Sequence, residues 1–270
     1  MSLAHTSLLA AAAILMAAPM AQAAPARPDP AIIKVIAPSG RLRAAINLGN
    51  GILAQRDAKT GELQGVSVQL AKALARELNL PIDLVAYHEA GATAEAGAKG
   101  EWDIAFLAID PKRAETIAFT APYVLIEGTY LVRASSPFRT IADVDHDGVK
   151  VGVAVGAAYD LYLTRALKHA QLVRAADGAT ALTEFDKGHQ DVMAGVGGML
   201  VLWAKDRPDM RVIEPGFQEI QQAMVTPKGR EAGLAYVAAF LERMKASGFV
   251  RKALDSTGQT DAQVAPPAKP

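Results

Sequence analysis

Arg113 is the residue of this sequence that most suggests chemistry, and it lies in the stretch DIAFLAIDPKRAETIAFTAPYV, residues 103–124. Asp110 and Pro111 predict the start of a short helix, because Asp can cap free amide groups and Pro suits the first helical position. Arg113 would then lie in the first turn, where the helix dipole disfavours a cation. An anion in front of the guanidinium would explain its position. The structural alternative is an ion pair with Asp110 or Glu115.

A second candidate anion site is the turn formed by Gly156, Ala157 and Ala158, which joins a predicted strand to a predicted helix. Backbone amides at a helix N-terminus can hold an anion. Neither residue 157 nor residue 158 carries a hydroxyl, so the amides would have to act alone. Tyr159 follows directly and is an aromatic candidate for the same site. The alternative is a plain strand-to-helix turn.

These residues need a sheet and helices to position them, and the hydrophobic pattern predicts both. Residues 66–78 predict an amphipathic helix with an apolar residue at every fourth position. Apolar runs predict strands at 41–48, 80–87 and 103–109 in the same half of the chain. A new alternation of strands and helices begins at Lys150. The pattern predicts an α/β protein with mostly parallel sheets.

The composition excludes several classes of protein. The chain has 270 residues, of which 51% are hydrophobic and 21% charged, so it can form one large domain or two moderate lobes. Basic and acidic residues number 28 each, and no basic run interleaves with aromatics, so we expect no nucleic-acid partner. The absence of Cys excludes disulfides and thiolate metal sites. The histidines show no metal-binding spacing, and we expect neither a metal nor a cofactor.

The two ends of the chain differ from its middle. Residues 1–24 predict a signal peptide, with an apolar core from Leu8 to Met20 and an A-x-A cleavage site at residues 21–23. A membrane anchor is the alternative, but the core is shorter than the roughly 20 apolar residues that span a bilayer. The proline-rich residues 25–39 predict a flexible arm. The polar residues 256–270 predict a disordered tail.

Four segments of the chain resemble one family. They are GELQGVSVQLAKALARELNL (61–80), WDIAFLAIDPKRAETIAFTAPYV (102–124), KVGVAVGAAYDLYL (150–163) and AFLERMKASGFVRKAL (239–254). In this order they resemble the type-3 bacterial extracellular solute-binding proteins, the amino-acid-binding components of ABC importers. The resemblance implies a two-lobed periplasmic binding protein of the type II fold, in which each lobe is a mixed, mostly parallel sheet flanked by helices. Lobe 1 would take residues 40–131 and 223–255, lobe 2 residues 133–220, and two strands would form the hinge.

The resemblance also implies a location and partners. We expect a periplasmic monomer that binds a small carboxylate-containing solute between its lobes and delivers it to an inner-membrane ABC permease. Arg113 matches the arginine that grips the ligand's α-carboxylate, and a guanidinium suits that role because it binds a carboxylate with two hydrogen bonds. Asn47 and Asn50 stand where the family often has an acidic and an aromatic residue. Ala108 stands in place of the usual serine-rich turn.

Val196 is the most consequential departure from the family pattern. The family's amino-acid binders carry an aspartate there, which pairs with the ligand's ammonium. An ammonium without a carboxylate in a closed cleft would be costly. We therefore expect a ligand without an adjacent amine, or an amine that is met elsewhere, for example by Glu127 or Asp160. No catalytic residue is assigned. The alternatives are a dehydratase-like enzyme on the same fold, which would use a glutamate near this position, and a ligand-sensing protein.

Overall fold

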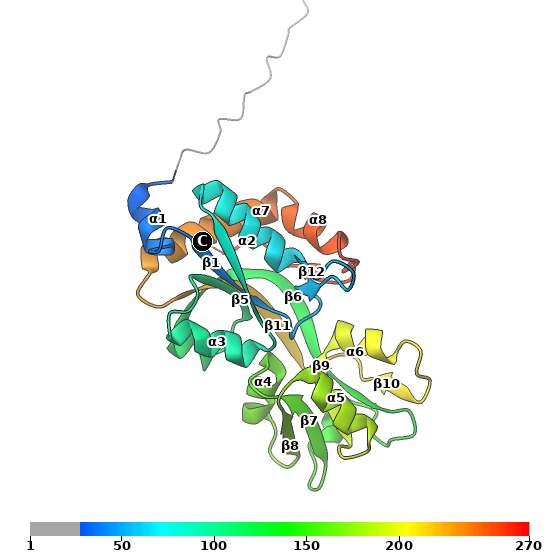
Figure 1. The fold of residues 1–270 in the computed structure, drawn as a ribbon. Helices are drawn as coiled ribbons and strands as arrows, with labels where there is room; N and C mark the ends of the chain where they lie inside the picture. The colour runs from blue at the N-terminus through cyan, green and yellow to red at the C-terminus, as the bar shows by residue number, and fades with distance from the viewer. Residues whose placement is uncertain (1–27, 270) are drawn as a thin grey trace, which may run out of the picture.

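The computed structural model describes residues 28–269 and shows a mixed α/β protein. The predicted signal peptide, residues 1–24, lies outside these residues. Two groups of strands and helices meet at a narrow waist, so the molecule has two lobes (Figure 1). The larger group is called lobe 1 and the smaller group lobe 2. None of the described helices combines the length and the apolar composition that crossing a membrane requires.

One ten-stranded sheet runs through both lobes, and its main path has the order β4-β1-β5-β11-β6-β9-β7-β8. Lobe 1 contains three parallel strands, β1 (Leu42–Asn47), β4 (Ile82–Tyr87) and β5 (Ile104–Ala108). Lobe 2 contains three others, β7 (Lys150–Ala154), β8 (Gln171–Ala175) and β9 (Val192–Val196). The short strand β10 (Met210–Val212) is antiparallel to β6. Strands β2 (Gln55–Arg56) and β3 (Leu63–Gln64) form a separate hairpin.

Two long antiparallel strands connect the lobes, β6 (Ile117–Arg133) and β11 (Gln218–Pro227). Gly128 marks the point where β6 changes neighbours, because it pairs with Gln218 on β11 and with Val196 on β9. Before this residue β6 belongs to the sheet of lobe 1, and after it to the sheet of lobe 2. Strands β6 and β11 therefore run from one lobe into the other.

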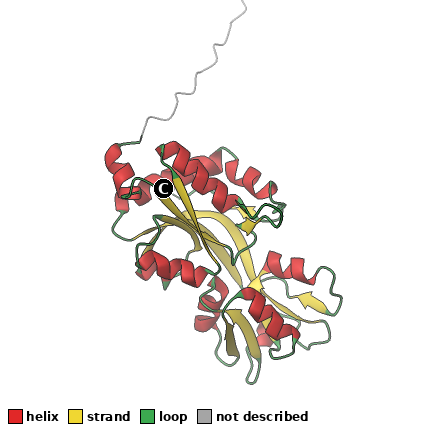
Figure 2. Ribbon diagram, in the orientation of Figure 1, coloured by secondary structure: helices red, strands yellow, loops and turns green. Residues whose placement is uncertain are grey.

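Helices cover both faces of each part of the sheet (Figure 2). In lobe 1 they are α1 (Pro30–Ile36), α2 (Val66–Leu78), α3 (Ala90–Ala98), α7 (Glu231–Ala246) and α8 (Phe249–Asp255). In lobe 2 they are α4 (Ala158–Ala166), α5 (Gly178–Asp186) and α6 (Gly197–Ala204). Two 3-10 turns, η1 (Arg113–Glu115) and η2 (Ile141–Val144), lie between strands.

Each lobe has its own buried core. In lobe 1 the side chains of Leu70, Tyr123 and Phe240 belong to one apolar cluster. In lobe 2 a different cluster contains Tyr130 and Val153. Burial of apolar surface in these separate clusters therefore stabilises each lobe.

The prediction of a flexible arm at residues 25–39 is wrong for the part that the structure describes, because residues 30–36 form α1. The Asp29 carboxylate accepts a hydrogen bond from the Ala31 amide at 2.8 Å, and Pro30 opens the helix. Ile36 is fully buried and packs close to Gly233 on α7. A proline-rich composition suggested a loop, but proline is favoured at a helix start and the isoleucines supply an apolar face.

The prediction of a disordered tail at residues 256–270 is also wrong for the part that the structure describes. Strand β12 (Gln263–Val264) pairs with Leu125 and Val124 on β6. Ala265 is buried, and its amide donates to the Tyr123 carbonyl at 3.0 Å. The backbone bonds pair a stretch of β6 that would otherwise be a free strand edge, and local composition carries no sign of this partner.

Candidate functional site

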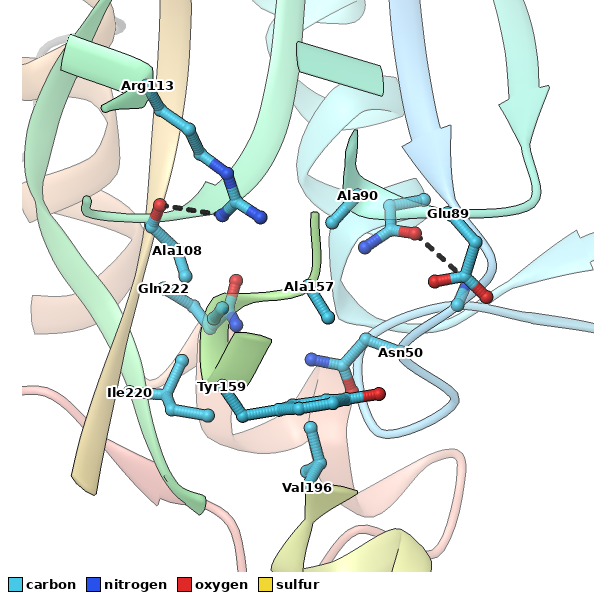
Figure 3. A pocket seen from close by; sticks show the side chains of 13 residues that line it. Asn50, Glu89, Ala90, Ala108, Arg113, Ala157, Tyr159, Val196, Ile220 and Gln222 are labelled. Atoms are coloured by element: carbon cyan, nitrogen blue, oxygen red, sulfur yellow. Dashed lines mark hydrogen bonds between the residues drawn. The ribbon is translucent and has the colours of Figure 1, made fainter. Parts of the chain in front are cut away.

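A small cavity lies between the lobes, where the carboxyl ends of parallel strands from both halves of the sheet converge (Figure 3). The space in it that the centre of a water molecule can occupy is about 30 Å³. The lining residues come from the ends of β1, β4, β5 and β9 and the loops after them, from η1, from the starts of α3 and α4, and from β11. They are Asn47, Gly49, Asn50, Glu89, Ala90, Ala108, Arg113, Ala157, Ala158, Tyr159, Val196, Ile220 and Gln222. Seven of the eight predicted site residues are among them, and the eighth, Gly156, contacts Arg113.

Arg113 lies in η1, a 3-10 turn rather than the predicted helix, and is only 4% exposed. One terminal nitrogen, Nη1, donates to the Ala108 carbonyl at 2.9 Å. The other, Nη2, donates to the Gly156 carbonyl of lobe 2, also at 2.9 Å. Nε is buried and has no hydrogen-bond partner among the described residues. The guanidinium is therefore held by neutral carbonyls and keeps an unused donor.

The ion pair considered for Arg113 does not form. Asp110 instead pairs with Arg165 of α4 at 2.9 Å, and its carboxylate also accepts from the Lys112 amide. Glu115 pairs with Lys112 at 2.9 Å. Burial lowers the pKa of Arg113 to about 10, and the charge of Asp110 opposes this shift. The side chain is therefore still a cation at neutral pH, desolvated and without a bonded carboxylate in the part of the chain that the structure describes.

The turn before α4 differs from the predicted anion site. The Gly156 amide donates to the Asp160 carboxylate at 2.8 Å, and the Ala157 amide donates to the Ala154 carbonyl at 3.2 Å. Two of the three backbone amides therefore already donate hydrogen bonds within the protein, and only the Ala158 amide of this turn remains as a donor for an anion. Gly156 contributes its carbonyl to Arg113 rather than its amide to a ligand.

Asn47 and Asn50 both line the cavity. The Asn47 Oδ1 accepts from the Gly49 amide at 2.9 Å, and the Asn50 Oδ1 accepts from the Ile52 amide at 3.2 Å. Both carbonyl ends therefore hold the loop after β1 in shape. Their Nδ2 groups remain as donors that can meet oxygen atoms of a solute.

Tyr159 and Val196 lie together along one side of the cavity, with the valine beneath the ring (Figure 3). Burial raises the pKa of Tyr159 above its ordinary value, and the nearby Glu89 raises it further. The phenol is therefore neutral at physiological pH. Val196 lines the cavity, so this position offers an apolar contact and no charge.

Neither of the two acidic residues that we expected to meet an amine is available for that role. Glu127 is exposed and lines a separate, larger cavity beside α6. Asp160 accepts the Gly156 amide and pairs with Arg174 at 2.9 Å.

Glu89 is not among the residues predicted from the sequence, but it lines the cavity. It directly precedes α3, and its Oε1 accepts a hydrogen bond from the Gly178 amide of lobe 2 at 3.2 Å. Burial raises the pKa of its carboxyl group. Its position just beyond the end of a predicted strand, at residues 80–87, was the signal that could have found it.

Several contacts join the two lobes around the cavity. Besides the bonds of Arg113 and Glu89, the pair between Asp110 and Arg165 crosses from lobe 1 to α4. Gly156 also approaches the backbone of Gly91 so closely that a Cβ on Gly156 would lie 2.9 Å from the Gly91 Cα. The lobes are closed on each other at this point.

Comparison with solved structures finds the same two-lobed architecture. A mutant of ArgBP from T. maritima has a TM-score of 0.72 at 22% identity, over 83% of this chain and 98% of that one. A cysteine-binding protein from Campylobacter jejuni has a TM-score of 0.74 at 21% identity, over 84% and 92% of the two chains. The ancestral amino acid-binding protein AncCDT-1, described as a precursor of cyclohexadienyl dehydratase, has a TM-score of 0.71 at 24% identity, over 83% and 97%. At these identities the likeness concerns the fold.

Comparison with curated proteins finds no match for the sequence. The model of one protein family matches residues 54–257, which is most of the chain and includes ten of the thirteen residues that line the cavity; Asn47, Gly49 and Asn50 lie before the matched region. The chain therefore belongs to family 3 of the bacterial extracellular solute-binding proteins.

Proposed function

We propose that this protein is the substrate-binding component of an ABC importer and that it binds a small carboxylate-containing solute between its lobes. The observation that carries the proposal is the buried guanidinium of Arg113, which has an unused donor and no bonded carboxylate among the described residues. A solute carboxylate would supply the missing anion, with hydrogen bonds shortened and strengthened by the charges. Solved relatives described as amino acid ABC transporter substrate-binding proteins support the same role.

The mechanism is closure around the ligand. Arg113, Asn47, Asn50 and Ala108 belong to lobe 1, whereas Gly156, Ala157, Ala158 and Tyr159 belong to lobe 2. A ligand that contacts both sets favours the closed state by the contacts that it makes only there. The closed form would then be the one that an inner-membrane permease receives. We propose that the protein acts in the periplasm as a monomer.

A second candidate function is a dehydratase on the same fold. One observation favours it: Glu89 has a raised pKa and lies in the cavity, as a general acid would. To test this alternative, each acid that binds is incubated with the protein, and mass spectrometry is used to detect the loss of water from the acid. Turnover would support the enzyme, and unchanged solute would support binding alone.

The test of the proposed function is a thermal-shift screen with amino acids, keto acids and dicarboxylates. A ligand that binds only the folded state raises the melting temperature in proportion to the logarithm of its concentration over Kd. We expect at least one carboxylate to raise it, and the shift to disappear in Arg113→Ala. A screen in which only solutes without a carboxylate bind would contradict the proposal.

A further inference from the structure

We propose that the larger cavity beside α6 is a second binding site, and that it takes a small organic cation with an apolar body, such as an alkylammonium ion. This space is called the α6 cavity. It is separate from the candidate site at Arg113, because Val196 is the one described residue that lines both. The inference goes beyond the proposed function and does not depend on it.

The α6 cavity lies on the side of the waist where α6 of lobe 2 and the C-terminal strand β12 of lobe 1 are found (Figure 1). Lobe 1 contributes the loop after β1 and residues 258–263, and β6 contributes residues on both sides of Gly128. The space that the centre of a water molecule can occupy is about 930 Å³. Pockets for small molecules typically measure about 300–1,000 Å³, so the cavity has the size of a ligand site.

Part of the lining is the apolar surface of α6. The helix consists only of glycine, alanine, methionine, leucine, valine and tryptophan, yet only Leu200 in it is buried. Val201 is 50% exposed and Leu202 is 63% exposed, and both line the cavity together with Met199. A helix that is apolar on all sides is normally covered on all sides, and exposed apolar patches bordered by polar residues mark binding grooves. The hydrocarbon part of an occupant would cover this face.

The charged part of the lining is acidic. Four carboxylates and one ammonium group line the cavity, although basic and acidic residues are equally numerous in the whole chain. The carboxylates belong to Glu127, Glu214, Glu219 and Asp261, and the ammonium group belongs to Lys205. None of these five forms an ion pair with another described residue. The lining therefore has a negative excess that a cation would offset.

Two of the carboxylates lie opposite each other on the strands that join the lobes. Glu127 of β6 and Glu219 of β11 are partners in the antiparallel register. Like charges directly opposite each other in a sheet are destabilising. The Glu219 carboxylate accepts a hydrogen bond from the neutral side chain of Gln221 at 3.0 Å, which does not balance the charge. A cation beside this pair would reduce the repulsion.

The same charges argue against other occupants of the apolar face. The carboxylates would repel a membrane surface that contains anionic lipids. A second copy of the chain in a two-fold dimer would bring the same acidic residues against this face. A hydrated metal ion would use the carboxylates but leave Val201 and Leu202 uncovered. An organic cation with a hydrocarbon chain uses both parts of the lining.

The experiment measures binding of three probes by calorimetry at low ionic strength. They are hexylammonium, ethylammonium, which has the charge but a short chain, and 1-hexanol, which has the chain but no charge. We expect hexylammonium to bind saturably at one site, about ten-fold or more tightly than either of the others. Arg113→Ala should keep this affinity, because Arg113 does not line the α6 cavity.

Variants of the lining test the two parts of the site. The double change Glu127→Gln and Glu219→Gln should weaken hexylammonium about five-fold or more, and Leu202→Ser about three-fold or more. All three side chains are exposed, so the variants should fold. Leu202→Met keeps the apolar surface and should bind normally. Glu95→Gln, an exposed change on α3 outside the cavity, is the control for a lost charge.

Several results would overturn the second site. They are the absence of saturable hexylammonium binding, equal binding of hexanol, and an affinity that is lost in Arg113→Ala but kept in the double variant. Analytical ultracentrifugation tests the remaining occupant: a dimer that Leu202→Ser converts to a monomer would show that a second copy covers the face. Each of these results leaves the proposed function standing, because that function is tested with carboxylates.

Discussion

Arg113 and Gly156 are joined across the cleft by a hydrogen bond of 2.9 Å from the guanidinium of lobe 1 to a backbone carbonyl of lobe 2. The residue proposed to bind the solute therefore also links the lobes without one. A carboxylate that enters the cavity must share Arg113 with this carbonyl or displace it. The guanidinium has five N–H donors, so its unused Nε leaves room for sharing.

The first prediction concerns Arg113 itself. Arg113→Ala should weaken binding of a carboxylate solute by about 2–5 kcal/mol, because it removes a desolvated charged partner. This corresponds to roughly 30- to 5,000-fold in Kd by calorimetry. Arg113→Lys should recover part of the loss, since a lysine keeps the charge but not the planar fork. Lys112→Ala, an exposed neighbour, is the matched control, and near-normal affinity in Arg113→Ala would remove the residue from the site.

The second prediction concerns closure at Gly156. Its φ is +70°, and an added Cβ would lie 2.9 Å from the Gly91 Cα in the other lobe. Gly156→Ala should therefore impose backbone strain of about 1–2 kcal/mol and also resist closure. The steric part should cost about 1–3 kcal/mol of binding, or roughly 5- to 150-fold in Kd.

Gly229→Ala separates these two effects. Gly229 has a φ of +80°, but an added Cβ would meet nothing within 4 Å. Both variants should lose stability, but Gly156→Ala alone should bind more weakly and keep a larger radius of gyration in small-angle scattering when ligand is present. Equal affinities in the two variants would show that the approach of Gly91 and Gly156 does not limit closure.

The sequence predicts those features that a local pattern determines. Residues 66–78 were predicted as a helix and form α2 with the same bounds, because Val66, Leu70, Leu74 and Leu78 repeat along one buried face. The arm and the tail were mispredicted because their order comes from distant partners, α7 for α1 and β6 for β12. Composition carries no information about such contacts.

The candidate site follows the same division. Local signals pointed to Arg113 and to the turn that leads into Tyr159, whereas the family resemblance pointed to Asn47, Asn50 and Ala108. The local sequence offered Asp110 as a possible ion-pair partner of Arg113. In the structure Asp110 pairs with Arg165 instead, which is 55 positions away in the chain. Glu89 was missed for a related reason. Its position just beyond a predicted strand was a local signal, but its contact with Gly178 at the start of α5 depends on how the lobes pack.

The third prediction tests a buried ion cluster that supports lobe 1. The Asp103 carboxylate is fully buried and pairs with Arg43 at 2.7 Å and with Arg230 at 3.1 Å. Asp103→Asn should lower the free energy of unfolding by about 3–5 kcal/mol, because it leaves two guanidinium groups without their anion. Asp83→Asn breaks a comparable pair with Arg41, but that pair is exposed and should cost less than about 1 kcal/mol. Chemical denaturation measures both, and similar losses would refute a special role for Asp103.

The last prediction uses the pKa of Glu89, which burial raises above its ordinary value; Asp177 raises it as well, while the Gly178 amide and His88 lower it. A carboxyl group whose pKa is higher in the folded state opposes folding at neutral pH, where it must be buried as a charge. The cost is relieved as the pH falls through the folded-state pKa, because the folded protein takes up the proton first. Glu89→Gln removes this titration and can still accept the Gly178 amide through its carbonyl oxygen.

The ligand-free Glu89→Gln variant should therefore be more stable than the unchanged protein at pH 7. The gain should shrink as the pH falls through the raised pKa and be absent below the ordinary value of 4.5. Thermal melts from pH 7.5 to pH 4 measure it, with Glu95→Gln as the control for helix α3. A gain that grows on acidification would show that Glu89 is stabilised as an anion within the protein.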